Sequence, residues 1–121
     1  MKRKTIRNHK DFLTPPDGIT AVTRFAVIKI KPAKIPGDAR YGLIVSKKMS
    51  KLATTRNRAK RLLRDWIAFN EKLMLSKFDY IFIARVGILN CSREYGRDRM
   101  KKAFRRIKRL VKKSTQNAEQ K

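Results

Sequence analysis

The sequence has little negative charge and few of the residues from which protein active sites are usually assembled. Nine Asp and Glu residues stand against 33 Lys and Arg, which gives the 121-residue chain a formal net charge of +24. The chain has one histidine, His9, and one cysteine, Cys91, and its acidic residues are scattered singly. Metal-dependent cleavage by the protein itself would need clustered carboxylates or histidines to hold Mg²⁺. The composition therefore argues against a protein-only nuclease.

The single cysteine and the absence of long apolar runs bear on where the protein works. One cysteine excludes an internal disulfide and fits a reducing cytosol, and we interpret Cys91 as a packing residue rather than a catalytic thiol. No apolar run approaches the roughly 20 residues that span a bilayer. The first ten residues, M-K-R-K-T-I-R-N-H-K, lack the apolar stretch of a signal peptide. We expect a cytoplasmic protein.

The chain does have enough apolar residues for a core, and a large excess of cations around it. With 121 residues, 41% of them hydrophobic, it is sized for one domain. We assign that domain to residues 1–113 and a flexible tail to residues 114–121. Like charges at this density destabilise a compact state unless a polyanion relieves their repulsion. The candidate partners are nucleic acid, an anionic membrane surface and an acidic protein.

Periodicity and turn residues predict an α+β protein. Strands are expected at residues 24–31, 40–48 and 76–85, with the first two joined by a hairpin loop over P-A-K-I-P-G-D-A, residues 32–39. A helix should begin at a Thr54 or Thr55 cap and end near Asn70. A last helix should run from Ser92 or Arg93 to Lys113. Its apolar stripe is Met100, Ala103, Phe104, Ile107, Leu110 and Val111. This order predicts helices packed on a small sheet.

The segment T-T-R-N-R-A-K-R-L-L-R-D-W-I, residues 54–67, predicts a helix with one apolar and one cationic face. At 100° per residue, the apolar face holds Ala59, Leu62, Leu63 and Trp66. The opposite face holds Asn57, Lys60, Arg61 and Arg64, with Arg56 and Arg58 at the borders. Neighbours at four-residue spacing are like charges, and only Asp65 offers a local countercharge. Arginine binds phosphate bidentately, so the pattern favours a phosphate-binding face over a merely solvated one. A membrane is disfavoured because the apolar residues are needed for the core.

These residues also carry a family resemblance. V-S-K-K, residues 45–48, followed by R-N-R-A-K-R-L-L-R, residues 56–64, is similar to the signature of the protein component of bacterial ribonuclease P. The resemblance extends to H-K-D-F (residues 9–12), R-F (24–25), D-Y-I-F-I-A-R-V-G (79–87) and the basic last helix, and covers nearly the whole chain. A structural ribosomal protein shares the charge and size but not this order of motifs.

The resemblance implies a fold and a function. The fold is a ribosomal-protein-like sandwich, a small mainly antiparallel sheet packed with helices, with a left-handed β-α-β crossover through the R-N-R helix. The function is that of an RNA-binding subunit of ribonuclease P, which assists a catalytic RNA in the endonucleolytic removal of the 5′ leader from precursor tRNA. The implied partners are that RNA and precursor tRNA, with no obligatory protein partner. The complex uses Mg²⁺, and catalysis is carried by the RNA.

By match to the family's motifs, the site residues fall into two groups. The R-N-R block, which contacts the catalytic RNA, comprises Arg56, Asn57, Arg58, Lys60, Arg61 and Arg64. A cleft between the sheet and an N-terminal helix, which holds the leader, takes Phe12, Lys47, Lys48, Lys51 and Arg85. Here Pro15-Pro16 interrupts the N-terminal helix, and Ile28 replaces an aromatic often seen in the first strand. Base stacking is therefore expected from Phe12, with Phe25 as a second candidate. Phe12 has the alternative of simply pinning the N-terminal segment to the core.

Overall fold

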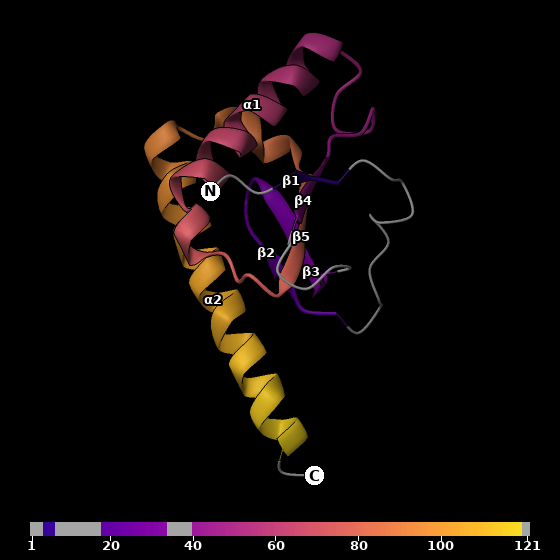
Figure 1. Cartoon of the computed structure of the whole chain (residues 1–121). Helices are drawn as coiled ribbons and strands as arrows, with labels where there is room; N and C mark the ends of the chain where they lie inside the picture. The colour runs from indigo at the N-terminus through magenta and orange to yellow at the C-terminus, as the bar shows by residue number, and fades with distance from the viewer. Residues whose placement is uncertain (1–3, 7–17, 34–39, 120–121) are drawn as a thin grey trace.

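The computed structural model describes residues 4–6, 18–33 and 40–119, and within these ranges one mixed sheet is covered on one side by two long helices (Figure 1). The helices are α1 (Ala53–Phe69) and α2 (Arg93–Glu119). Short 3-10 helices, η2 (Glu71–Leu73) and η3 (Val86–Asn90), flank the last strand. The strands are β1 (Lys4–Thr5), β2 (Thr20–Val22), β3 (Ala26–Pro32), β4 (Arg40–Ile44) and β5 (Phe78–Ala84). The α+β class predicted from the sequence is confirmed.

The strand order is β1-β4-β5-β3-β2, so the predicted hairpin is wrong. β3 and β4 do not pair with each other. β5 lies between them, antiparallel to β3 and parallel to β4. β5 reads F-D-Y-I-F-I-A, with apolar residues pointing to both faces, a pattern typical of a buried strand in the interior of a sheet rather than at its edge. The parallel β4–α1–β5 unit is a crossover through the helix that carries the R-N-R block.

Alternation along β3 and β5 separates the two faces of the sheet. Ile28 pairs with Phe82 and Ile30 with Tyr80, and all four side chains are buried beneath the helices. The ring of Phe104 on α2 lies 5.4 Å from that of Tyr80 and 6.0 Å from that of Phe82, measured between centroids. The alternate residues of β3 turn to the other face, where they are partly exposed: Val27, Lys29 and Lys31. Only the helix-covered face therefore carries the main core.

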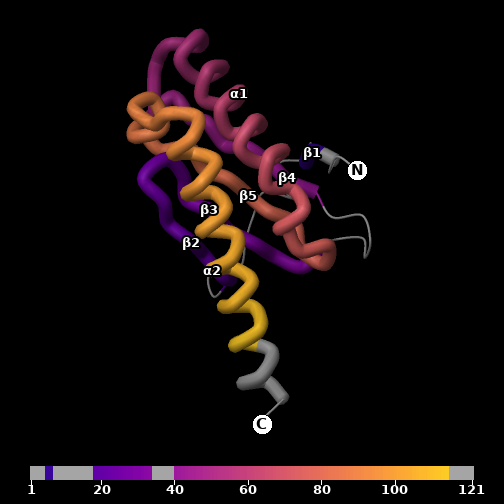
Figure 2. The backbone as a smooth tube through the Cα atoms, turned by 90° about the vertical axis from the view of Figure 1, so that its left-hand side faces the viewer, coloured from indigo at the N-terminus to yellow at the C-terminus, as the bar shows by residue number. Residues whose placement is uncertain are grey.

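Both predicted apolar helix stripes are confirmed. On α1 the buried residues are Ala59, Leu63, Trp66 and Ile67, and Leu62 is partly buried against them. On α2 the buried residues are Met100, Ala103, Phe104 and Ile107, with Leu110 and Val111 partly buried. Figure 2 shows the two helices side by side over the sheet, with α2 extending past its edge. No helix in the described ranges is long and apolar enough to cross a membrane.

The ends of the helices differ in part from the prediction. α1 begins one residue before Thr54, with Leu52 at the N-cap and no side-chain cap, so the predicted threonine cap is wrong. Ser92 does cap α2, since its Oγ accepts a hydrogen bond from the Tyr95 N–H at 3.1 Å. α2 continues past the predicted end at Lys113 to Glu119.

Helix α2 lies so close to α1 that a single glycine permits the contact. Gly96 is buried, and a Cβ at this position would collide with the indole of Trp66. That indole is fully buried and makes an edge contact with Phe25, with ring centroids 4.8 Å apart. The close approach of the two helices therefore depends on the absence of a side chain at residue 96.

We predict that Gly96→Ala destabilises the protein by about 1–3 kcal/mol, the range for overpacking a core. Alanine is normally favoured over glycine inside a helix by about 1 kcal/mol. A loss of stability on Gly96→Ala would therefore have the opposite sign to the effect of helix propensity. Urea unfolding measures the change. In a Trp66→Leu background, where the colliding ring is gone, Gly96→Ala should cost little. Equal costs in the two backgrounds would contradict the assigned contact.

Candidate nucleic-acid interface

The outward face of α1 is cationic and exposed. Asn57, Arg58, Arg61 and Arg64 are exposed, and Lys60 is partly so, while the opposite side of the helix is in the core. None of these five side chains has a hydrogen bond or ion pair to a carboxylate among the described residues. The face predicted from helical periodicity is confirmed in position. We call these five residues, with Arg56, the α1 basic face.

Arg56 differs from the rest of this face because its side chain is partly used within the protein. Its Nη1 donates to the backbone oxygens of Ser50 at 3.0 Å and of Lys51 at 2.9 Å. These bonds tie the preceding turn, which Met49 anchors in the core, to the start of α1. Arg56 therefore positions the turn that carries Lys47, Lys48 and Lys51 as well as adding a charge.

The first turn of α1 is suited to an anion. It has no side-chain cap and no acidic residue. The first N–H groups of a helix have no partner within it, and the helix dipole places partial positive charge there. Ala53, Thr54 and Arg58 are exposed in this first part of the helix. Free N–H donors thus lie beside cationic side chains, the arrangement that binds phosphate at helix N-termini.

The one acidic residue on the helix is neutralised from elsewhere. Asp65 accepts two hydrogen bonds from Arg97 of α2, from Nε at 3.1 Å and from Nη2 at 3.0 Å. These bonds lower the pKa of Asp65, against an opposing effect of burial, and the charges of Arg97 and Arg93 lower it further. The guanidinium of Arg97 also lies 4.4 Å from the ring centroid of Phe69. Asp65 is therefore engaged with α2 and offers no countercharge to the α1 basic face.

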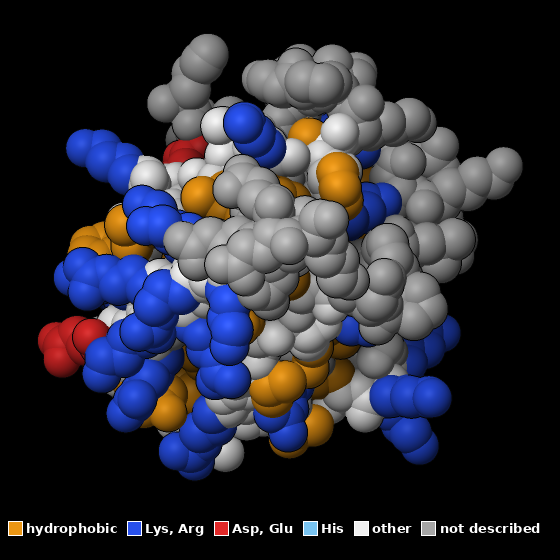
Figure 3. Space-filling view, turned by 90° about the horizontal axis from the view of Figure 1, so that it is seen from below, with side chains coloured by type: hydrophobic (Ala, Val, Ile, Leu, Met, Phe, Trp, Pro, Cys, Tyr) orange, Lys and Arg blue, Asp and Glu red, His pale blue; other side chains and the backbone are white. Residues whose placement is uncertain are grey.

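The other predicted cations gather at one end of the sheet. β4 and β5 are parallel neighbours, so the turn after β4, with exposed Lys47 and Lys48, and Arg85 after β5 leave the sheet at the same edge. Arg85 is exposed, and its Nη1 donates to the backbone oxygen of Thr23 at 2.8 Å. Figure 3 shows Lys and Arg side chains crowded over the helical side of the molecule with few acidic ones among them.

The aromatic residues predicted to stack on bases have different outcomes. Phe25 is fully buried against Trp66, so its assignment as a stacking residue is wrong. Ile28 is also buried, on the helix side of the sheet, and an aromatic there would be unavailable to RNA. Phe12, His9 and the N-terminal helix fall outside the described residues. The cleft that the resemblance implies is thus described on its sheet side alone.

The described residues offer little for protein-borne catalysis. Burial raises the pKa of the Cys91 thiol, against a smaller lowering by Arg24, so the thiol is protonated at neutral pH. Its Sγ lies 3.2 Å from the backbone oxygen of Gly87. Within the described ranges, no three His, Cys, Asp or Glu side chains lie together as a group that could hold a metal ion. The side chains that this surface presents are mainly those of lysine and arginine.

Comparisons with known proteins found a matching family model and several similar proteins. The model of the ribonuclease P family matches residues 1–108. A ribonuclease P protein component from Marinomonas sp. is 42% identical over 66% of this chain, and that alignment spans 60% of the relative's length. One from Idiomarina loihiensis is 32% identical over 79% of this chain and 74% of its own length. The structure of Staphylococcus aureus RNase P protein superposes with a TM-score of 0.66 at 25% identity, covering 92% of this chain and 97% of that one.

We predict that Asp65→Asn lowers the free energy of unfolding by less than about 1 kcal/mol at neutral pH, because the ion pair is partly exposed. The folded-state pKa of Asp65 is lowered, so its contribution is complete above the unfolded pKa of about 3.9 and disappears as pH falls through the folded value. Urea unfolding of the unaltered protein and of the Asp65→Asn variant at several pH values measures this difference in the free energy of unfolding. A difference that persists undiminished at pH about 2 would contradict the assignment.

Proposed function

Because this chain belongs to the ribonuclease P protein family, we propose that it is an RNA-binding subunit that helps a catalytic RNA to remove the 5′ leader from precursor tRNA. The single observation that supports this proposal most strongly is the α1 basic face. It is exposed and without carboxylate partners in the described structure, on a helix whose other side is in the core. Such a face is stabilised when phosphates approach it.

In this proposal the α1 basic face binds the catalytic RNA. Its arginines supply planar forks that bind phosphate oxygens bidentately, and the uncapped first turn supplies backbone N–H donors. Asn57 lies among them and can hydrogen-bond a sugar or base. Because the face lies along a rigid helix, its cations are held at fixed spacing rather than on a mobile loop.

The precursor's leader is proposed to run past the carboxyl ends of β4 and β5. Lys47, Lys48 and Lys51 on one turn and Arg85 beside it provide the charge, and Phe12 is the proposed stacking residue. The sheet face turned away from the helices begins at this edge and carries Lys29 and Lys31. A single strand can follow such a cationic surface through its phosphates without sequence-specific contacts.

The proposed contribution to the reaction is binding, not chemistry. Mg²⁺ used by the complex would be held by RNA phosphates, because the described donor set favours cation–phosphate contacts and lacks a carboxylate cluster. Protein cations offset repulsion among those phosphates and so favour the folded RNA and its Mg²⁺ sites. Contacts that are equally strong in the ground state and the transition state lower KM without raising kcat.

Reconstitution tests this function. Protein stripped of RNA should leave precursor tRNA intact, and addition of the catalytic RNA from the same source should restore cleavage at the leader junction. The protein should lower the KM or the Mg²⁺ requirement relative to the RNA alone. Lys48→Ala should raise the KM for a long-leader precursor but not for one whose leader is one or two nucleotides. Cleavage by the protein alone, or no effect of protein on the RNA's reaction, would reject the proposal.

Variants of α1 separate binding from folding. We predict that Arg61→Ala or Arg64→Ala weakens binding of the catalytic RNA and reduces the slope of log K against log salt by about 0.7–0.9 per lost phosphate contact. Stability should be unchanged or slightly higher, since like-charge repulsion is relieved. Leu63→Ala, at a buried position between these two arginines in the sequence, should lower stability by about 2–5 kcal/mol. If Arg61→Ala unfolded the chain and Leu63→Ala did not, the two faces would be wrongly assigned.

A further inference from the structure

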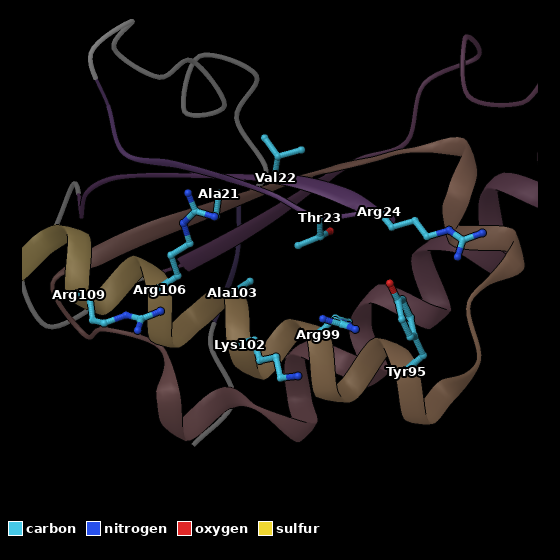
Figure 4. Close-up of a pocket in the computed structure, with 10 residues that line it drawn as sticks. All are labelled: Ala21, Val22, Thr23, Arg24, Tyr95, Arg99, Lys102, Ala103, Arg106 and Arg109. Atoms are coloured by element: carbon cyan, nitrogen blue, oxygen red, sulfur yellow. The ribbon is translucent and has the colours of Figure 1, made fainter.

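A second cationic surface lies on the far flank of α2, where the helix meets the edge strand β2. A cavity of about 360 Å³ opens there between Ala21–Arg24 and the first half of α2. Figure 4 shows the side chains of Tyr95 and Arg106 pointing from the helix toward the strand. Among the residues that the structure describes, no acidic residue lines the cavity and five cations do: Arg24, Arg99, Lys102, Arg106 and Arg109. We call this the β2–α2 pocket.

The charge of this pocket is largely unneutralised. Lys102 pairs with Asp98 at four-residue spacing, with Nζ and Oδ2 3.3 Å apart, and both side chains are mostly exposed. The other four cations have no acidic partner in the part of the chain that the structure describes. Around one cavity, such a group of like charges costs stability in the free protein. An anion entering the pocket would remove that cost.

The β2–α2 pocket is separate from the α1 basic face. At 100° per residue, the buried stripe of α2 around Phe104 divides its polar surface into two flanks. Arg97 lies on the flank toward α1, where it holds Asp65. Arg99, Lys102 and Arg106 lie on the other flank, toward β2. The body of α2 thus stands between the two cationic surfaces, so they can bind different segments of RNA.

The row of cations on α2 is long enough for a polyanion. Arg99 and Arg109 are ten residues apart on one helix, which at 1.5 Å per residue separates them by about 15 Å. One duplex strand carries a phosphate about every 3.4 Å along the helix axis, so several phosphates can meet this row. A single free phosphate would engage only one or two of the cations.

Two further features of the pocket suit RNA. In the β2·β3 ladder, Thr23 N donates to Ala26 O at 2.8 Å and Ile30 N to Ile19 O at 3.1 Å. In an antiparallel pair, alternate residues direct their N–H groups toward the partner strand and away from it. The N–H of Val22 therefore points outward at the sheet edge, where it can donate to a phosphate. The Tyr95 ring also lies in the pocket, with the Arg99 guanidinium 5.2 Å from its centroid. A flat aromatic–guanidinium pair can stack on a base.

We propose that the β2–α2 pocket is a second RNA-binding site that holds a phosphodiester segment independently of the α1 basic face. This inference rests on the proposed function in that the partner is RNA. Either the catalytic RNA or precursor tRNA could supply the segment, and the two sources share the chemistry that the pocket recognises.

Site-directed cross-linking identifies the source. A photoreactive azidophenacyl group is attached to Lys102→Cys in a Cys91→Ser background, with Lys101→Cys, exposed outside the pocket, as the matched control. Each protein is irradiated with labelled catalytic RNA alone and with precursor tRNA added. A defined cross-link from residue 102 to either RNA, absent from residue 101, supports the proposal and names the source. Equal or diffuse cross-linking from both positions overturns it.

Binding measurements test the energetics with equal charge loss. Arg99→Gln/Arg106→Gln should weaken binding of the catalytic RNA, or of precursor tRNA to the complex, by about tenfold or more at about 0.1 M salt, and reduce the salt slope by about 1.4–1.8. The control Lys101→Gln/Lys112→Gln removes two exposed charges of α2 outside the pocket. Equal effects of the two double variants on both RNAs would overturn the pocket while leaving the proposed function intact. Failure of the unaltered protein to bind the catalytic RNA would instead reject the proposed function.

Discussion

Repulsion among the chain's surplus cations is the constraint on which the rest of the structure depends. With a net charge of +24 on 121 residues, the fold must keep its cations apart and hydrated while the core supplies the cohesion. The structure does so with a buried apolar layer between the helices and one face of the sheet, and the two helices meet closely where Gly96 faces Trp66. The cations described lie outside this layer, and most of them are exposed.

Within the described residues, two acidic side chains link elements of the fold through arginine. Asp65 joins α1 to α2 through Arg97, and the buried Asp79 joins β5 to the start of β4 through the backbone N–H and side chain of Arg40. Both pairs link elements distant in sequence. The α1 basic face and the β2–α2 pocket have almost no acidic countercharges among the described residues. Both surfaces therefore have the electrostatic character expected of RNA-binding sites.

Helical periodicity made the helices predictable. The pairing of the strands and the burial of individual aromatic residues could not be predicted in this way. The faces of α1 and α2 follow from residue spacing alone. Strand order does not, because the loop sequence between β3 and β4 does not reveal that β5 lies between these two strands. Phe25 was a second candidate for base stacking, yet it is fully buried and its ring makes an edge contact with Trp66. The helix side of the β2–α2 pocket can be seen in the sequence, because Arg99, Lys102 and Arg106 follow one another at three- and four-residue spacing. The strand side cannot, because β2 is too short to predict.

The most direct test of this account is the stability of the RNA-free protein as a function of salt. Urea unfolding should be followed at fixed pH from about 10 to about 200 mM monovalent salt, across which the Debye length falls from about 30 to about 8 Å. Urea is uncharged, so it leaves the screening to the added salt. If unneutralised cations dominate, the free energy of unfolding should rise steadily with salt. A free energy that is flat or falls with salt would contradict the central claim, because it would mean that the charges of the folded chain are already balanced.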